Sequence, residues 1–162
     1  MTTSFGQLLR TLRGANVDFI LAGGIAAAAH GSARATSDLD VVYARTRDNL
    51  GRLVAALAPL QPYLRGAPAG LPFSWDVETL ARGLNFTLIT GAGEIDLLGE
   101  IVGGGRYEDL IGATERIQAF GVECLVLSLD TLIVVKRAAG RPKDLEALAE
   151  LEAIAEERRR QR

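Results

Sequence analysis

The segment GGIAAAAHGSARATSDLDVVYA, residues 23–44, contains the features that decide how this chain folds. Asp38 and Asp40 stand two residues apart in SDLDVVYA, a stretch that otherwise has the pattern of a buried strand. Alternate residues of a strand point to the same face, roughly 6 to 7 Å apart along the backbone. Two neighbouring carboxylates repel each other, and burying either one unpaired costs several kcal/mol. We therefore expect a positive charge between Asp38 and Asp40.

A divalent cation would supply that charge. Mg²⁺ takes oxygen ligands and keeps several positions for water and phosphate, and Mn²⁺ would serve in its place. The apolar stretch GEIDLLGE offers a third carboxylate, Asp96, and Glu94 shares its face by alternation, nearer the hairpin turn. Alternatively, the three aspartates are separately solvated or paired with arginines. The pattern favours a metal site made of Asp38, Asp40 and Asp96.

Gly23 and Gly24 stand where a predicted strand meets a predicted helix. Without side chains at this point, backbone amides can approach an anion closely. The spacing is neither that of a dinucleotide-binding loop nor that of a P-loop. The glycine pair alone is explained as well by a tight turn without a ligand. Followed fourteen residues later by the carboxylate pair, it indicates a phosphate-binding turn.

The composition limits the classes of function. The chain has 162 residues, 48% hydrophobic and 23% charged, which suits one globular domain. Its formal net charge of −2 gives no general attraction to nucleic acid. The single cysteine, Cys124, excludes an internal disulfide, and the single histidine, His30, leaves no zinc site and weakens any Ser-His-Asp scheme. Cys124 reads as a buried apolar residue, and His30 as a helix-end packing residue.

The hydrophobic pattern predicts strands and helices in a single domain. We expect strands at about residues 18–22, 37–43, 85–90 and 94–99, short strands in ERIQAFG and VECLVLS, a loop from Gln61 to Trp75, and C-terminal helices over about 129–158. In the C-terminal region, the cap and turn residues are Ser128, Gly140 and Pro142. The last helix should bury one face, formed by Leu145, Leu148, Leu151 and Ile154.

Two segments resemble a known superfamily. LAGGIAAAAHGSARATSDLDVV is similar to the signature of the nucleotidyltransferases that include DNA polymerase β, in which a glycine turn and a short helix precede an Asp-x-Asp strand. Asp96 matches the third element, a lone aspartate on an apolar strand. LIVVKRAAGRPKDLEAL is similar to the Lys-then-Arg-Asp motif of the AbiEii-type toxin nucleotidyltransferases and related small bacterial enzymes. The resemblance runs discontinuously from about Phe19 to Leu148.

The resemblance implies an α/β (α+β) fold with a mixed sheet flanked by helices, and a role for each matching residue. Asp38 and Asp40 would bind Mg²⁺, and Asp96 would be the general base or the ligand of a second metal. The implied phosphate-binding residues are Gly23, Gly24 and Lys136, with Arg141 and Asp144 supporting the site. A lysine that extends to the surface is an alternative for Lys136. Arg34 and Thr36 would either contact phosphate or pair with Asp38.

The activity implied is transfer of a nucleoside monophosphate from an NTP such as ATP to a hydroxyl of an RNA (tRNA) or protein acceptor, in a toxin–antitoxin system. We expect a cytoplasmic protein without a membrane segment, because Asp18 interrupts the N-terminal apolar run. The resembling toxins are longer, so a second copy or an antitoxin would complete the acceptor site. The basic tail from Arg158 to Arg162 is the candidate RNA contact.

Two alternatives remain. One is an inactive nucleotide-binding or interaction module, which the intact set of three aspartates disfavours. The other is a small-molecule, antibiotic-modifying nucleotidyltransferase. That reading requires an acidic pocket for a cationic substrate, and the loop from Gln61 to Trp75 carries no acid.

Overall fold

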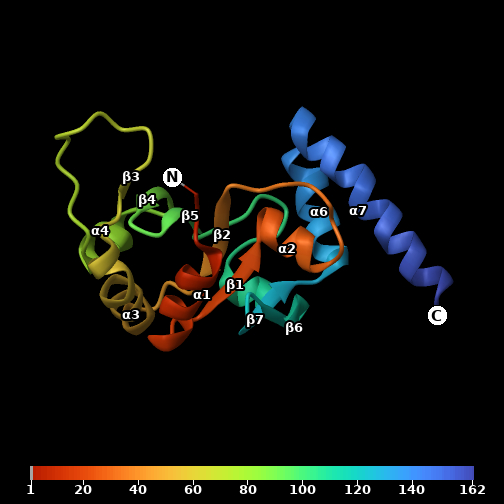
Figure 1. Ribbon diagram of the computed structural model, residues 1–162, viewed down its shortest axis with the longest axis horizontal. Coiled ribbons are helices and arrows are strands. Elements are labelled where there is room, and N and C mark those ends of the chain that lie inside the picture. Colours follow the sequence, from red (N-terminus) through yellow and green to blue (C-terminus); the bar gives the residue numbers. More distant parts are fainter. Residues whose placement is uncertain (1) are drawn as a thin grey trace.

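A seven-stranded mixed sheet runs through the protein, whose computed structural model describes residues 2–162 (Figure 1). The strand order is β3-β4-β5-β2-β1-β7-β6, and the pairs β2–β5 and β1–β7 are parallel while the others are antiparallel. The strands are β1 (Phe19–Ala22), β2 (Asp38–Tyr43), β3 (Tyr63–Leu64), β4 (Asn85–Thr90), β5 (Gly93–Leu98), β6 (Thr114–Ala119) and β7 (Val122–Leu127). The predicted mixed α/β fold is confirmed.

Helices pack at both ends of this sheet (Figure 1). They are α1 (Phe5–Gly14), α2 (Gly23–Ala29), α3 (Arg47–Leu57), α4 (Val77–Arg82), α5 (Tyr107–Leu110), α6 (Leu129–Ala139) and α7 (Pro142–Arg160), with short 3₁₀ turns at Ala58–Leu60 and Ile111–Ala113. In Figure 1, α6 and α7 form an antiparallel pair beside α2, whereas α3 and α4 lie at the opposite end. No helix of the described residues combines the length and the apolar character that crossing a membrane requires.

The predicted element boundaries agree with the structure except in two places. The segment from Gln61 to Trp75 is not wholly a loop, because Tyr63 and Leu64 form the edge strand β3, paired with β4. Leu145 does not belong to the buried face of α7, since it is 52% exposed while Leu148 and Leu151 are buried. The buried residues of α7 are Asp144, Leu148, Leu151 and Ala155, and Ile154 is partly buried against the core.

The predicted caps around α6 are present. The Ser128 side chain accepts a hydrogen bond from the Thr131 amide, and Gly140 ends the helix in the left-handed conformation, with φ of 65°. Left-handed backbone favours glycine because it has no Cβ. The tight turn that Gly140 permits brings the start of α7 back against α6.

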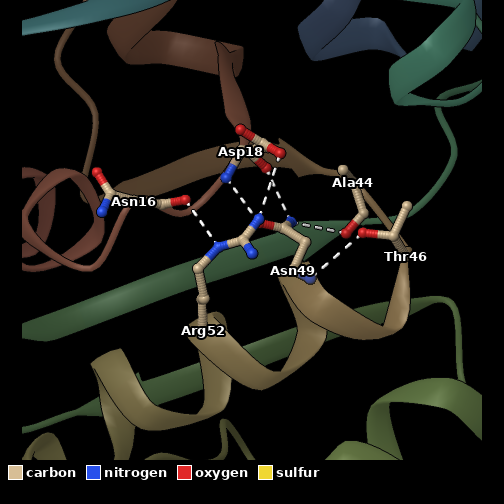
Figure 2. Close-up of polar contacts among 6 residues, drawn as sticks. All are labelled: Asn16, Asp18, Ala44, Thr46, Asn49 and Arg52. Atoms are coloured by element: carbon tan, nitrogen blue, oxygen red, sulfur yellow. Dashed lines mark hydrogen bonds and ion pairs between the residues drawn. The ribbon is translucent and has the colours of Figure 1, made fainter.

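A buried asparagine fixes the first two strands to α3. Asn49 is fully buried, and its Oδ1 accepts a hydrogen bond from the Asp18 amide while its Nδ2 donates to the carbonyls of Asp18 and Ala44 (Figure 2). Arg52 on the next helical turn donates to the Asn16 carbonyl. Buried polar groups are tolerated when they are satisfied in this way. The network holds the start of β1 and the end of β2 in register, which in turn sets where β2 places its aspartates.

Candidate active site

Four carboxylates lie on one face of the sheet where β2 runs beside β5. In this parallel pair, Asp40 lies opposite Asp96, and Asp38 lies opposite Glu94. Residues directly opposite in neighbouring strands share a face, and so do residues i and i+2 of one strand. Carboxylate oxygens of Asp38, Asp40 and Asp96 lie within 4.8 Å of one another. The predicted convergence of these three aspartates is therefore confirmed, although their chemical roles stay predictions.

The cluster is electrostatically strained without a cation. Burial, reinforced by the charges of Asp38 and Asp96, raises the pKa of Asp40 to about 8. Burial also raises the pKa of Asp96, as does its hydrogen bond with Asp38. Asp40 Oδ1 is buried and has no hydrogen-bond partner. Three convergent carboxylates, one with an orphaned oxygen, fit a hard divalent cation such as Mg²⁺ or Mn²⁺.

The glycine pair is required by the packing of this cluster. Gly23 has φ of 60°, and a Cβ added to it would lie 1.8 Å from Asp40 Oδ2. A Cβ added to Gly24 would lie 2.7 Å from the Thr36 side chain. Glycine at both positions therefore lets the Asp40 carboxylate and the Thr36 hydroxyl lie directly against the turn that starts α2. Phosphate binding by this turn remains a prediction.

A second charged cluster joins the end of α6 to the start of α7. Asp144 is fully buried, and it accepts hydrogen bonds from Lys136 Nζ at 3.3 Å and from Arg141 Nε at 2.6 Å. The hydrogen bond from Arg141, and then that from Lys136, lowers the pKa of Asp144. Asp144 holds Lys136 and Arg141, and both of these cations line the cavities beside the aspartates. Asp144 is thus placed to anchor Lys136 and Arg141, and it lines the cavity that these two residues share with Asp40.

Two cavities meet at the aspartates. One, of about 420 Å³, is lined by all three aspartates and by basic or hydroxyl residues, which are Ser32, Arg34, Thr36, Lys136, Arg141 and Lys143. The other, of about 440 Å³, is mainly apolar and is lined by Leu98, Ile101, Val102, Leu132, Val135 and Ala139, with Glu100 at its edge. Asp40, Lys136 and Arg141 line both cavities. A polar and an apolar compartment therefore share one wall at the carboxylates.

Arg34 and Thr36, in the loop before β2, were expected either to contact phosphate or to pair with Asp38. Arg34 does not pair with Asp38, because its guanidinium lies 3.6 Å from Glu146 on α7 and its side chain is about half exposed. Thr36 Oγ1 donates to the Asp38 carbonyl at 3.2 Å, so it supports the start of β2 through the backbone. Both residues line the polar cavity. Their contact with phosphate remains a prediction.

The two residues expected to be structural are buried. His30 follows α2, and its Nε2 lies 2.8 Å from the Leu127 carbonyl. Cys124 lies on β7 without a thiol partner, and burial raises its pKa to about 11, which keeps the thiol protonated and unreactive.

One functional candidate was missed. Arg65, directly after β3, places its guanidinium 2.9 Å from Asp96, 3.6 Å from Glu94 and 4.0 Å from Asp38. It brings a positive charge to this cluster, but it does not lie between Asp38 and Asp40 as expected, because it makes no ion pair with Asp40. Little in the sequence pointed to it, because Arg65 stands in a stretch rich in proline and glycine that is typical of a loop. A single arginine paired with three carboxylates also differs from the alternative in which each aspartate has its own arginine.

Comparisons with known proteins find a similar fold among solved structures but no match among sequences. No protein-family profile matches the sequence, and no curated protein matches it significantly. Among solved structures, the lincosamide antibiotic adenylyltransferase LnuA, bound to lincomycin, superposes with a TM-score of 0.61 over 95% of this chain and 99% of that one, at 11% identity. A protein from Thermotoga maritima, provisionally assigned as a nucleotidyltransferase, gives a TM-score of 0.56 over 89% and 87% of the two chains, at 16% identity. The chain has the fold of these nucleotidyltransferases, with its four carboxylates on one face of the shared sheet.

Proposed function

We propose that this protein is a metal-dependent nucleotidyltransferase. In the reaction, an acceptor hydroxyl oxygen attacks the α-phosphorus of an NTP, the bond from that phosphorus to the pyrophosphate oxygen breaks, and pyrophosphate leaves with its electron pair. Asp96 takes the hydroxyl proton. The observation that carries the proposal is the convergence of Asp38, Asp40 and Asp96 within 4.8 Å, beside a cavity lined by cations. The shared fold agrees with it.

Asp38 and Asp40 would hold the metal, with Asp96 close enough to contribute a ligand instead of acting as the base. When bound, Mg²⁺ or Mn²⁺ neutralises phosphate charge and stabilises the attacking and leaving oxygens. The chain's own contribution is to position the nucleotide. Lys136 and Arg141, held by Asp144, line the polar cavity together with Arg34 and Thr36. Their charges and hydroxyl suit a triphosphate, of ATP or another NTP, lying against the turn at Gly23 and Gly24.

The resemblance to AbiEii-type toxins supports a macromolecular acceptor, a tRNA or a partner protein within a toxin–antitoxin system in the cytoplasm. Arg158 and Arg160, in the basic tail, are both engaged: Arg158 donates to the His30 carbonyl, and Arg160 pairs with Glu156. Exposed residues such as Arg159 and Arg162 would make any RNA contact. Removing residues 158–162 should then weaken tRNA modification and make the salt dependence shallower, since fewer phosphates are neutralised.

A small organic alcohol is the second candidate acceptor, and two observations favour it. The apolar cavity of about 440 Å³ opens beside Asp40, and Glu100 at its edge could pair with a cationic group. The structural neighbour LnuA is an antibiotic adenylyltransferase, and the superposition covers 99% of its length. The absence of acid in residues 61–75 does not count against this candidate, because none of those residues lines either cavity. We rank the small-molecule acceptor above a macromolecular one on these grounds.

An acceptor screen tests the proposal. Purified protein, Mg²⁺ and each labelled NTP are incubated with tRNA, with co-encoded proteins and with hydroxylated antibiotics, and pyrophosphate release is measured beside an Asp38→Ala control. We expect release that requires an acceptor and is lost in the control. Tight NTP binding in calorimetry without pyrophosphate release from any acceptor would instead favour a nucleotide-binding module.

A further inference from the structure

Arg65 belongs to the same cross-strand row as two of the aspartates. The pairing of β3 with β4 matches Leu64 to Leu88, and the next step brings the Arg65 amide to the Thr87 carbonyl at 3.0 Å. Thr87 lies opposite Asp96, and Asp96 lies opposite Asp40. The row from the sheet edge inward is therefore Arg65, Thr87, Asp96 and Asp40, all on one face. The backbone of the edge strand thus fixes the guanidinium over the carboxylates.

The contacts of Arg65 are uneven. Nη2 donates a hydrogen bond to Asp96 Oδ1 at 2.9 Å and lies 4.0 Å from Asp38, while Nη1 is 3.6 Å from Glu94. Nη1 is buried and makes no hydrogen bond. Among the described residues, Arg65 provides every ion pair made by these three carboxylates. One well-formed hydrogen bond therefore coexists with one unused donor that faces Glu94.

A divalent cation and the Arg65 guanidinium would compete for the carboxylates of Asp38 and Asp96. Asp38 and Asp96 are members of the convergent set that would hold a metal, whereas Glu94 is not. Two cations a few ångströms apart in a partly buried site repel each other strongly. Arg65 can relieve that repulsion by moving toward Glu94, because Nη1 already points there without a partner.

We propose that Arg65 is a resident counterion of the carboxylate cluster, which releases Asp38 and Asp96 when the metal arrives and is then held by Glu94. The inference rests on the proposed metal-dependent function. Arg65 acts here as a positioning residue, through the carboxylates and not on the substrate. It offsets part of the negative charge of the cluster in the metal-free protein and makes metal binding conditional on its own displacement.

Metal affinity without nucleotide is the test. Mn²⁺ is titrated into the full-length protein, and free Mn²⁺ is measured by electron paramagnetic resonance. We expect Arg65→Gln to bind Mn²⁺ roughly tenfold more tightly than the natural protein, since a competing charge near 4 Å is removed. Arg116→Gln is the matched control, because it removes the same charge from β6 at the opposite edge of the sheet and should leave the affinity unchanged. Circular dichroism verifies that each variant is folded.

Glu94→Gln provides a second measurement through a double-mutant cycle. We expect this substitution to weaken Mn²⁺ binding more when Arg65 is present than in the Arg65→Gln background, because Glu94 then has no arginine to hold. Unchanged or weaker Mn²⁺ binding in Arg65→Gln, or equal effects of Glu94→Gln in both backgrounds, overturns the counterion role and leaves the proposed function intact. Failure of both the natural protein and Arg65→Gln to bind Mn²⁺ overturns the metal site and the proposed function with it.

Discussion

Asp144 and Asp40 line the same cavity and illustrate opposite surroundings for a carboxylate. Asp144 is fully inaccessible, yet two cations donate hydrogen bonds to it and its pKa is lowered. Asp40 keeps some exposure, yet one of its oxygens has no partner, its nearest charged neighbours are carboxylates, and its pKa is raised to about 8. Burial alone therefore does not explain why the two pKa values shift in opposite directions. The sign of the neighbouring charges explains it.

The difference separates a structural charge from a functional one. A buried carboxylate with its partners in place joins α6 to α7 and aims Lys136 and Arg141. A carboxylate surrounded by other carboxylates destabilises the folded protein. Such electrostatic repulsion is expected at a functional site, where a bound ligand relieves it. The predictions below test this contrast, beginning with the largest effect.

The largest effect should come from Asp40→Asn in the transfer reaction. Removing one metal-holding carboxylate should cost several kcal/mol of transition-state stabilisation, which is roughly a thousandfold in rate of pyrophosphate release. Asp130→Asn, an exposed acid in the first turn of α6, is the control and should retain full activity. Substantial activity in Asp40→Asn would remove the aspartate cluster from the reaction.

Asp144→Asn and Asp40→Asn should change the free energy of unfolding in opposite directions. Asp144→Asn leaves Lys136 and Arg141 without their carboxylate, and we expect the free energy of unfolding to fall by about 2–4 kcal/mol. Asp40→Asn removes the cost of keeping this carboxyl protonated well above its ordinary pKa, and it should raise that free energy in the metal-free protein at pH 7.5. Urea denaturation in EDTA measures both.

A control calibrates the Asp144 result. Glu152→Gln breaks the exposed pair with Arg137 and should change stability by less than about 1 kcal/mol. If Asp144→Asn costs no more than Glu152→Gln, Asp144 is not an anchor and the contrast fails.

Gly23→Ala should damage the aspartate cluster through packing alone. A Cβ at φ of 60°, in direct collision with Asp40 Oδ2, costs about 1–2 kcal/mol in backbone strain and displaces the carboxylate. We expect lower thermal stability and weaker Mn²⁺ binding. Gly51→Ala, in α3 with open space around it, should instead stabilise by roughly 0.5–1 kcal/mol. Unchanged Mn²⁺ affinity in Gly23→Ala would show that Asp40 does not need this close approach.

The last effect to test is the pH dependence of the stability of the metal-free protein. The pKa of Asp40 is about 8 in the folded chain and about 3.9 when unfolded, so between these values the folded state holds the extra proton. The free energy of unfolding should consequently fall as pH rises from about 4 to 8, and then level. Asp144, whose pKa is lowered, contributes stability above about pH 4 that is lost in more acidic solution.

Urea titrations at pH 5, 7 and 9 in EDTA test this pH dependence. Asp40→Asn should flatten the decline between pH 5 and 9, and saturating Mn²⁺ should reverse it, because the metal favours the ionised carboxylates. A decline of equal slope in Asp40→Asn would assign it to other groups.

Local pattern accounts for what could be predicted of the fold. Strands β1, β2, β4 and β5, the caps of α6 and the Asp38–Asp40 pair follow from alternation, capping and turn chemistry within a few residues. The convergence of Asp96 with that pair also followed, because a third carboxylate on a neighbouring strand completes a site for a divalent cation. The exposed Leu145 and the short strand β3 did not follow, since a two-residue edge strand exists only through its pairing with β4.

By itself, the sequence determined the elements, the mixed sheet and the three aspartates, because these depend on periodicities of two and 3.6 residues and on interactions along one segment. Only the tertiary structure decided which charges face them. Arg65 reaches Asp96 across 31 residues of sequence through the register of β3, β4 and β5, and the turn at Gly140 brings Asp144 against Lys136 of α6. Strand register and helix packing are set by the whole core, so the partner of each carboxylate is a property of the folded chain.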